Sequence, residues 1–458
     1  MCQENHIEVP TLCYLKRLGP IGTCRMCLVE IEGLNIPVAS CTTKAKDGMV
    51  IRTNTERLER IRRENLKILL AHHPISMFSS IDEDNELLPL IHRYGITPAE
   101  IYEYGTEPIE YKKSKHPSKI LNYNPNRCIL CGRCIEACTE VTRIGALMYD
   151  GKGAAAVVNA QQKTIFYSPE CISCGECLSV CPVNAIEFEK VRYDVPKWAT
   201  KDVETICPYC GVGCTVIYRA NNEEIVGVEK KYEKGVNKGS LCVKGRFGFD
   251  FAVKEDRLKT PMLRRGDGFV PISWDEAYDI IRVKLMEIKA KYGPDAIMGL
   301  SSAKCRNEDN YLFQKFMRAA IGTNNVDHCA RLCHSSTVAG LKEVFGAGAM
   351  TNSIDDMSRA DAIFVIGSNT TEAHPVIGTM IKRSVDVLGT KLIVCDPRKI
   401  ELTKFASLWI QHRPGTDVAL LNGIANILYT KGMWDKEFVN NRTEGFEEYI
   451  ETIKKIYP

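Results

Sequence analysis

Two cysteine runs with the same spacing constrain the fold of this chain more than any other feature. Residues 128–138 and 171–181 each follow the pattern C-x2-C-x2-C-x3-C, and Pro182 follows the second run. Loops with three closely spaced cysteines disfavour zinc and favour an iron–sulfur cluster. A chance occurrence of both motifs is negligible, so we expect residues 119–190 to fold around two clusters.

The runs have the spacing of bacterial ferredoxins, in which the fourth cysteine of each motif binds the other cluster. The prediction is therefore a crossed pair of [4Fe–4S] sites. The first set is Cys128, Cys131, Cys134 and Cys181, and the second set is Cys171, Cys174, Cys177 and Cys138. Thr139 stands where the first run would usually have proline, which is a small departure.

Cysteine usage also indicates the compartment. Seventeen of the 21 cysteines lie within the first 242 residues. Because no export signal precedes them, metal binding is favoured over disulfides, and the predicted location is the cytoplasm. The net charge of +3 gives no reason to expect nucleic-acid binding. The sequence contains no run of about 18 apolar residues, so we predict no membrane span.

A looser cysteine set opens the chain, with spacing C-x10-C-x2-C-x13-C at Cys13, Cys24, Cys27 and Cys41. Residues 28–31 alternate as a strand would, and four thiolates of this kind can hold zinc or an iron–sulfur cluster. The spacing resembles the [2Fe–2S] domain at the front of the large subunit of complex I and of iron-only hydrogenases. That family has a β-hairpin before this point, so residues 1–52 are expected to be incomplete at their N-terminus.

Residues 53–118 are charged and mostly helical in pattern. The segment ENLKILLAHHP resembles the next module of that family, in which one histidine and three cysteines bind a [4Fe–4S] cluster. Only the histidine remains, as His72 or His73. The aligned cysteine positions carry Met77, Ser80 and Glu86. We predict that this module persists without its cluster.

A fourth cysteine set follows a predicted linker at residues 191–202. Residues 200–256 contain C-x2-C-x3-C-x27-C at Cys207, Cys210, Cys214 and Cys242. Gly211 and Gly213 allow the backbone to pass close to a cluster. The pattern resembles the small [4Fe–4S] domain that opens the molybdopterin oxidoreductases. Lys244 would match the family lysine between cluster and pterin, although taken on its own it is better interpreted as a surface lysine.

From residue 257 onward, helices alternate with short apolar strands, which predicts a doubly wound α/β domain with a parallel sheet over 257–458. The expected helix is 274–290, and the expected strands are 296–300, 361–366 and 391–395. No G-x-G-x-x-G motif follows a strand, so no nicotinamide or flavin site is expected here. The complete fold class is a multidomain α/β chain. It has a β-grasp-like [2Fe–2S] module and a ferredoxin-like module before this core.

Polar turns follow the predicted strands, where ligands of such sheets bind. Each could also be an ordinary loop cap. The candidate residues are Gly367, Ser368, Asn369, Asp396, Pro397, Arg398, Gly415 and Asp417.

Cys333 and His334 place a thiol beside an imidazole within residues 330–340, where a helical segment follows. A lone pair of this kind is more often a buried thiol beside an ordinary histidine. The upstream cysteine sets change that balance, because a chain with so many cluster ligands should have a redox reaction to serve.

Together these stretches resemble the catalytic subunit of a molybdenum- or tungsten-dependent formate dehydrogenase with a complex-I-like front end. The resemblance implies one [2Fe–2S] cluster, three [4Fe–4S] clusters and a bis-pyranopterin guanine dinucleotide carrying Mo or W. Cys333 would match the metal ligand and His334 the proton acceptor. The turns at Gly367, Asp396 and Asp417 would match pterin contacts.

The resemblance also implies formate or carbon dioxide as the substrate and a redox partner: a NAD-linked flavin or iron–sulfur subunit, a ferredoxin or a hydrogenase. The family's substrate-binding arginine and C-terminal domain would lie beyond Pro458. The chain is therefore expected to be a fragment or one piece of a split subunit, in which a separate chain supplies the C-terminal half. Two alternatives stay open: another pterin oxidoreductase such as a nitrate reductase, and an electron-transfer subunit with a non-catalytic pterin fold.

Overall fold

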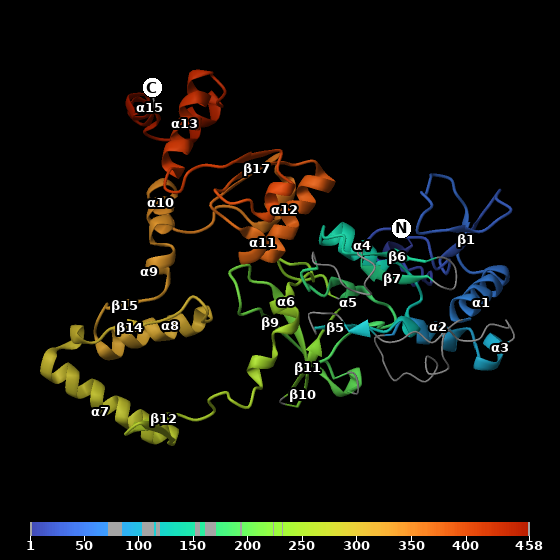
Figure 1. The fold of residues 1–458 in the computed structure, drawn as a ribbon, viewed down its shortest axis with the longest axis horizontal. Helices are drawn as coiled ribbons and strands as arrows, with labels where there is room; N and C mark the ends of the chain where they lie inside the picture. The colour runs from blue at the N-terminus through green and yellow to red at the C-terminus, as the bar shows by residue number, and fades with distance from the viewer. Residues whose placement is uncertain are drawn as a thin grey trace. The chain divides into compact units, whose positions relative to one another are not determined.

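A computed structural model describes the chain as two compact units, Met1–Ser353 and Ile354–Pro458. Figure 1 follows the chain from the iron–sulfur region into these later segments. The described residues are 2–71, 85–102, 114–115, 120–151, 156–160, 171–192, 195–222, 224–230 and 232–456. No helix within these ranges has the length and apolar character needed to cross a bilayer.

The first module is a small antiparallel sheet in the order β2-β1-β3. Its strands are β1 (Leu28–Ile31), β2 (Val38–Ala39) and β3 (Ile51–Arg52), after the short helix η1 (Gln3–Asn5). The predicted strand at 28–31 is confirmed. Helix α1 (Glu56–Leu70) begins at Thr55, whose side chain accepts a hydrogen bond from the Leu58 N–H. Leu58 is fully buried and packs with Cys27, Leu28 and Ala39.

The described part of residues 53–118 is mostly helical, as its pattern predicts. Its helices are α1 and the shorter α2 (Leu87–Arg93) and α3 (Pro98–Tyr102). The predictions made for His72, His73, Met77 and Ser80 lie outside the described residues. Glu86 is described and immediately precedes α2.

The ferredoxin-like module pairs its first and last strands. Strand β5 (Leu121–Tyr123) lies between β4 (Ser114–Lys115) and β8 (Ile186–Phe188) in an antiparallel sheet. A second antiparallel pair joins β6 (Leu147–Asp150) to β7 (Val157–Ala160). Its helices are η3 (Pro125–Arg127), α4 (Arg133–Glu136), the π-helix η4 (Ala137–Val141) and α5 (Glu176–Val180).

The next module is an antiparallel sheet in the order β11-β10-β9, followed by a short helix. Its elements are η6 (Lys197–Ala199), β9 (Lys201–Ile206), β10 (Thr215–Asn221), β11 (Glu224–Val228), α6 (Val243–Phe247) and η7 (Asp250–Ala252). The predicted linker at 191–202 therefore already contains η6 and the start of β9. Phe247 of α6 packs on Phe188 of β8, with 4.4 Å between ring centroids.

Residues 262–345 contain the predicted long helix, which forms α7 (Trp274–Tyr292). The strand expected at 296–300 is confirmed only at its end, because Pro294 begins the helical turn η8 (Pro294–Ala296). Strand β14 (Gly299–Leu300) pairs in parallel with β15 (Val326–Asp327). The other elements are β12 (Met262–Arg265), β13 (Gly268–Pro271), α8 (Asn307–Lys315), η9 (Phe316–Ile321), α9 (Ala330–Cys333) and α10 (Ser335–Phe345).

The second unit has the parallel sheet that the alternating pattern predicted. Strands β16 (Ala362–Ile366), β17 (Lys391–Cys395) and β18 (Leu408–Ile410) pair in parallel in this order. Helix α12 (Pro375–Leu388) lies beside β17 (Figure 1), and Ile381 joins Leu392 and Val394 in one buried core. The other helices are η10 (Ile354–Arg359), α11 (Thr370–Ala373), η11 (Glu401–Lys404), α13 (Asp417–Thr430), α14 (Lys436–Arg442) and α15 (Phe446–Ile456).

Candidate cluster and pterin sites

The four thiols of the N-terminal set form two hydrogen-bonded pairs. A hydrogen bond from the Cys24 thiol lowers the pKa of Cys13 to about 5, and the Leu12 N–H lies 3.4 Å from the Cys24 sulfur. Burial, followed by a hydrogen bond with Cys27, raises the pKa of Cys41 to about 12. The chain segment around β1 thus gathers the sulfurs that the spacing C-x10-C-x2-C-x13-C singled out.

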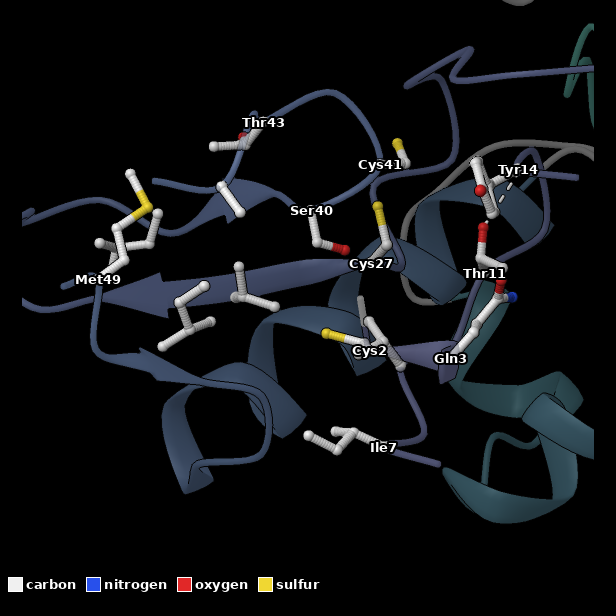
Figure 2. A pocket seen from close by; sticks show the side chains of 15 residues that line it. Cys2, Gln3, Ile7, Thr11, Tyr14, Cys27, Ser40, Cys41, Thr43 and Met49 are labelled. Carbon is white, nitrogen blue, oxygen red and sulfur yellow. Dashed lines mark hydrogen bonds between the residues drawn. The ribbon is translucent and has the colours of Figure 1, made fainter. Parts of the chain in front are cut away.

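A cavity of about 310 Å³ opens beside two of these thiols. Figure 2 shows the sulfurs of Cys27 and Cys41 directed to the same side of it, with the thiol of Cys2 below them. Apolar side chains of β1 line the cavity further along the strand, among them Val29 and Ile31. Sequence reasoning had assigned no role to Cys2.

The ferredoxin-like thiols come together across the two runs. Burial, and then the neighbouring sulfurs of Cys128, Cys131 and Cys181, raise the pKa of Cys134 well above its ordinary value. Cys181 of the second run is a neighbour of Cys128, Cys131 and Cys134, as the crossed pattern predicts, and Cys177 adds a smaller contribution to the pKa shift of Cys134.

The second set behaves in the same way. Burial raises the pKa of Cys177 well above its usual range, with further contributions from Cys174, Cys138 and Cys171. Here Cys138 of the first run joins three thiols of the second. Thiolates held together in this way repel one another, and cationic iron would relieve that repulsion.

Matching backbone geometry supports the two loops. Leu130 and Ser173, each preceding the second cysteine of its run, have left-handed φ values of 54° and 52°. Gly132 and Gly175 follow those cysteines at φ 80° and 74°. Successive N–H groups in such conformations form concave anion sites, which suit the sulfides of a cluster. The N–H groups of Ala146 and Ala185 each lie 3.2 Å from the fourth sulfur of their run, Cys138 and Cys181 respectively.

The fourth set surrounds the turn between β9 and β10 and the start of α6. Burial, then Cys207, Cys210 and Cys242, raise the pKa of Cys214 to about 12, so these four thiols also lie together. Gly213 has φ 72°. A Cβ on Gly245 would lie 3.5 Å from the Cys207 sulfur, so the first turn of α6 passes close to the thiols. Lys244 lies on α6 with an exposed side chain.

The residues present fit iron–sulfur clusters by donor chemistry, since each of the four sets offers soft sulfur ligands. Over the described ranges, no three His, Cys, Asp or Glu side chains are placed to hold one metal ion. A cluster of several irons holds its thiolates farther apart than a single ion does.

Cys333 and His334 lie where α9 meets α10. Both side chains are exposed, and the neighbouring Leu332 is 94% exposed. The His334 N–H donates to the Ala330 carbonyl at 2.8 Å, and the His334 carbonyl accepts from the Val338 N–H. The backbone thus holds the pair at a helix junction with both side chains accessible.

Two of the predicted turns, after β16 and β17, lie at the carboxyl edge of the parallel sheet, and Gln411 from the end of β18 contacts one of them. Asp396 follows β17 and is 2% exposed; its carboxylate accepts a hydrogen bond from the Arg398 N–H at 2.8 Å. Gly367 follows β16 at φ 60°, and its N–H donates to the Cys395 carbonyl. Gln411, after β18, donates to the Pro397 carbonyl at 2.8 Å.

Local contacts also explain the other members of these turns. The Ser368 hydroxyl lies 3.0 Å from that of Thr370, at the start of α11, and Asn369 precedes this helix. Gly415 has φ 83°, and Asp417 begins α13. Loop capping therefore accounts for part of this polar pattern.

Sequence reasoning missed His412. Its Nε2 lies 3.1 Å from the Asp417 carboxylate, while its Nδ1 is buried with no hydrogen-bond partner among the described residues. An orphaned polar atom at the ligand edge of a parallel sheet fits a group that brings its own donors and acceptors, as a dinucleotide does. The only available signal was the position of His412 just after a short apolar strand.

Comparison with protein families first defines the class. Residues 1–56 match a 2Fe-2S iron-sulfur cluster binding domain and residues 120–182 a 4Fe-4S dicluster domain. Residues 200–254 match the molybdopterin oxidoreductase Fe4S4 domain, and 257–450 match molybdopterin oxidoreductase itself. The chain therefore combines iron–sulfur cluster domains with a molybdopterin oxidoreductase domain over residues 257–450.

Relatives match over nearly the whole chain. "Probable oxidoreductase YjgC" of Bacillus subtilis (strain 168) is 36% identical over 99% of this chain and 49% of its own length. "Putative formate dehydrogenase SAB2186c" of Staphylococcus aureus (strain bovine RF122 / ET3-1) is 32% identical over 97% of this chain and 49% of its length. The chain thus spans about half the length of these relatives.

Among solved structures, acetylene hydratase from Pelobacter acetylenicus resembles the chain with a TM-score of 0.50. It is 26% identical over 56% of this chain and 36% of its own. A shared fold of this kind does not by itself define the reaction, which depends on the residues of the site.

Proposed function

We propose that this chain is the iron–sulfur and pterin-binding part of a formate dehydrogenase that interconverts formate and carbon dioxide. The observation that carries the proposal is the accessible Cys333–His334 pair in the molybdopterin domain of a chain with four gathered cysteine sets. The naming of the Staphylococcus aureus relatives supports the choice of substrate. In the proposal the enzyme is cytoplasmic and delivers electrons to a redox partner subunit.

The chain's own residues divide the work. Cys333 would bind Mo or W as a thiolate, a soft ligand suited to a sulfur-rich centre. When bound, the pterin-held metal would accept the two electrons that formate loses on becoming carbon dioxide. His334 would hold the released proton on its neutral ring nitrogen.

Other groups would bind and orient the cofactors. The turns at Gly367, Asp396 and Asp417, with the Nδ1 of His412, would hold the guanine dinucleotides at the sheet edge. Lys244 would lie between pterin and the Cys207 cluster. The cysteine sets would hold one [2Fe–2S] and three [4Fe–4S] clusters, which supply one-electron transfer.

The decisive experiment is Cys333→Ser in the complete enzyme, with any chain that supplies the C-terminal half. Serine offers a harder and more basic oxygen, so formate-dependent dye reduction should fall by orders of magnitude while iron content stays unchanged. Full activity in this variant would overturn the proposal and make Cys333 a scaffold thiol. If the purified wild-type enzyme contains iron and sulfide but no Mo or W, the chain is better explained as an electron-transfer subunit with a non-catalytic pterin fold.

A further inference from the structure

Two buried charges occupy the same place in the two ferredoxin-like runs. Arg133 lies between the second and third cysteines of the first run, directly after Gly132, and Glu176 occupies the matching position after Gly175. Arg133 is 1% exposed and Glu176 is 2% exposed. Burying a charge is costly unless it is paired and hydrogen-bonded, so each must be held by its surroundings.

Glu176 is paired with arginines from two other modules. One carboxylate oxygen accepts from the guanidinium of Arg246 on α6 at 2.9 Å and from the Leu241 N–H at 3.2 Å. The other oxygen lies 3.1 Å from a guanidinium nitrogen of Arg17, in the N-terminal module. Arg246 is itself 2% exposed, so its pair with Glu176 is fully buried.

Arg246 and Arg17 also donate hydrogen bonds to a backbone carbonyl and a side chain of the second run. Arg246 Nε donates to the Cys174 carbonyl at 3.0 Å, and Arg17 donates to the Ser179 hydroxyl at 2.9 Å. Close packing accompanies these bonds. A Cβ on Gly175 would lie 2.4 Å from the Cδ of Arg246 and 2.5 Å from the ring of Phe247. Any other residue there would have to displace the side chains of Arg246 and Phe247.

Arg133 makes the opposite pairing on the other run. Its two terminal nitrogens contact both carboxylate oxygens of Glu86 at 2.8 and 2.9 Å, a bidentate pair. One of them also donates to the Tyr14 carbonyl at 3.1 Å, next to Cys13. The Thr23 hydroxyl, one residue before Cys24, donates to the Cys131 carbonyl at 3.0 Å. The first run is therefore bonded to the N-terminal cysteine module.

From this juxtaposition we propose that Glu176 and Arg133 are positioning residues for electron transfer between modules. Glu176 fixes the Cys171–Cys177 loop against α6, whose N-cap is Cys242, mainly through the fully buried Arg246, and its second oxygen also contacts Arg17 of the N-terminal module. Arg133 fixes the Cys128–Cys134 loop against the Cys13 module. The opposite charges make the two joints non-interchangeable, because each loop would meet a like charge at the other joint. The inference rests on the cluster content in the proposed function but not on formate as substrate.

The test uses the full iron-loaded chain reduced with dithionite, so that it is independent of formate. Neighbouring reduced clusters split each other's electron paramagnetic resonance signals, and the splitting falls steeply with separation. Glu176→Gln leaves Arg246 and Arg17 without their counter-charge. We expect loss of the splitting between the Cys207 cluster and the second ferredoxin cluster, with all iron retained.

Matched variants separate positioning from general damage. Glu187→Gln removes a carboxylate from the same module whose partner, Arg127 at 2.6 Å, belongs to that module too, so the splitting should be unchanged. Glu176→Gln combined with Arg246→Gln removes both buried charges and should restore part of the splitting. Arg133→Gln should affect only the coupling to the [2Fe–2S] cluster.

Two outcomes would overturn the inference. One is an unchanged splitting in Glu176→Gln with normal iron content. The other is equal loss of both couplings in Glu176→Gln and Arg133→Gln, which would indicate nonspecific loosening. If Glu176→Gln does not fold, Glu176→Asp, which keeps the charge but shortens its reach, must reproduce a partial loss for the inference to hold. Loss of formate activity with intact splitting in Cys333→Ser would bear on the proposed function alone.

Discussion

The cysteine sets before residue 243 and the pterin region after it are built on opposite plans. In the first, two or three ligands of each set stand two or three residues apart in one loop, the remaining ligands come from elsewhere in the chain, and the thiols are buried or half-buried. In the second, Cys333 and His334 are exposed on a helix junction, and the candidate pterin contacts come from three separate turns of a parallel sheet. Spacing thus encodes a cluster site locally, whereas a large cofactor site depends on how distant turns are assembled.

The largest effect should come from removing one of the two cysteines that are predicted to bind the cluster of the other run. Cys181→Ser should abolish the first ferredoxin cluster although the mutation lies in the second run, lowering iron from about 14 to about 10 atoms per chain. Cys138→Ser should lose the same amount of iron but the other cluster's paramagnetic signal. Anaerobic iron analysis with spectroscopy checks both. Loss of the second cluster in Cys181→Ser would show that the sets are not crossed.

A sharper test of the pterin side is His334→Ala in the complete enzyme. Loss of a general base should lower formate oxidation about 10²–10⁴-fold. Because only the neutral imidazole accepts a proton, the wild-type rate should fall on the acid side, and this limb should vanish in the variant. Iron content serves as the control. A variant that keeps the acid limb would assign proton transfer to another group.

Lys244 lies in the sequence where the last cysteine set ends and the region before the pterin domain begins. Lys244→Met keeps the length of the side chain but removes its charge, and should slow electron exit roughly tenfold if a nearby charge contributes about 1–2 kcal/mol. Stopped-flow reduction of the clusters by formate measures this step, with iron content as control. Unaltered kinetics would return Lys244 to an ordinary surface lysine.

The smallest expected effect lies in the helices after the first sheet. A hydrogen bond from Arg63 lowers the pKa of Glu100 from 4.5 to about 2. The ionised Glu100 therefore stabilises the fold fully at pH values above its pKa in the unfolded chain. This contribution is lost as the pH falls through its pKa in the folded chain. Glu100→Gln should abolish the part of the acid dependence of unfolding between about pH 4.5 and 2. An unchanged acid profile in denaturant titrations would contradict this assignment.

Sequence reasoning succeeded where local pattern decides structure. The strand 28–31, the helix from Trp274 and the parallel strands near 362 and 391 formed as predicted. The expected strand at 296–300 was shorter, because Pro294 fixes a helical turn before it. His412, Arg133 and Glu176 could not be predicted, since burial of a polar group depends on partners far away in sequence.

The pair of Arg133 with Glu86 has a consequence for how many electrons the chain can store. The sequence comparison predicts that Glu86 stands where the related module has a cluster cysteine, and in the structure its carboxylate is bound by the Arg133 guanidinium. A salt bridge has no accessible redox state, so this position adds mechanical stiffness and no storage capacity. In a complete reductive titration the chain should therefore take up one electron fewer than a relative whose module keeps its cluster.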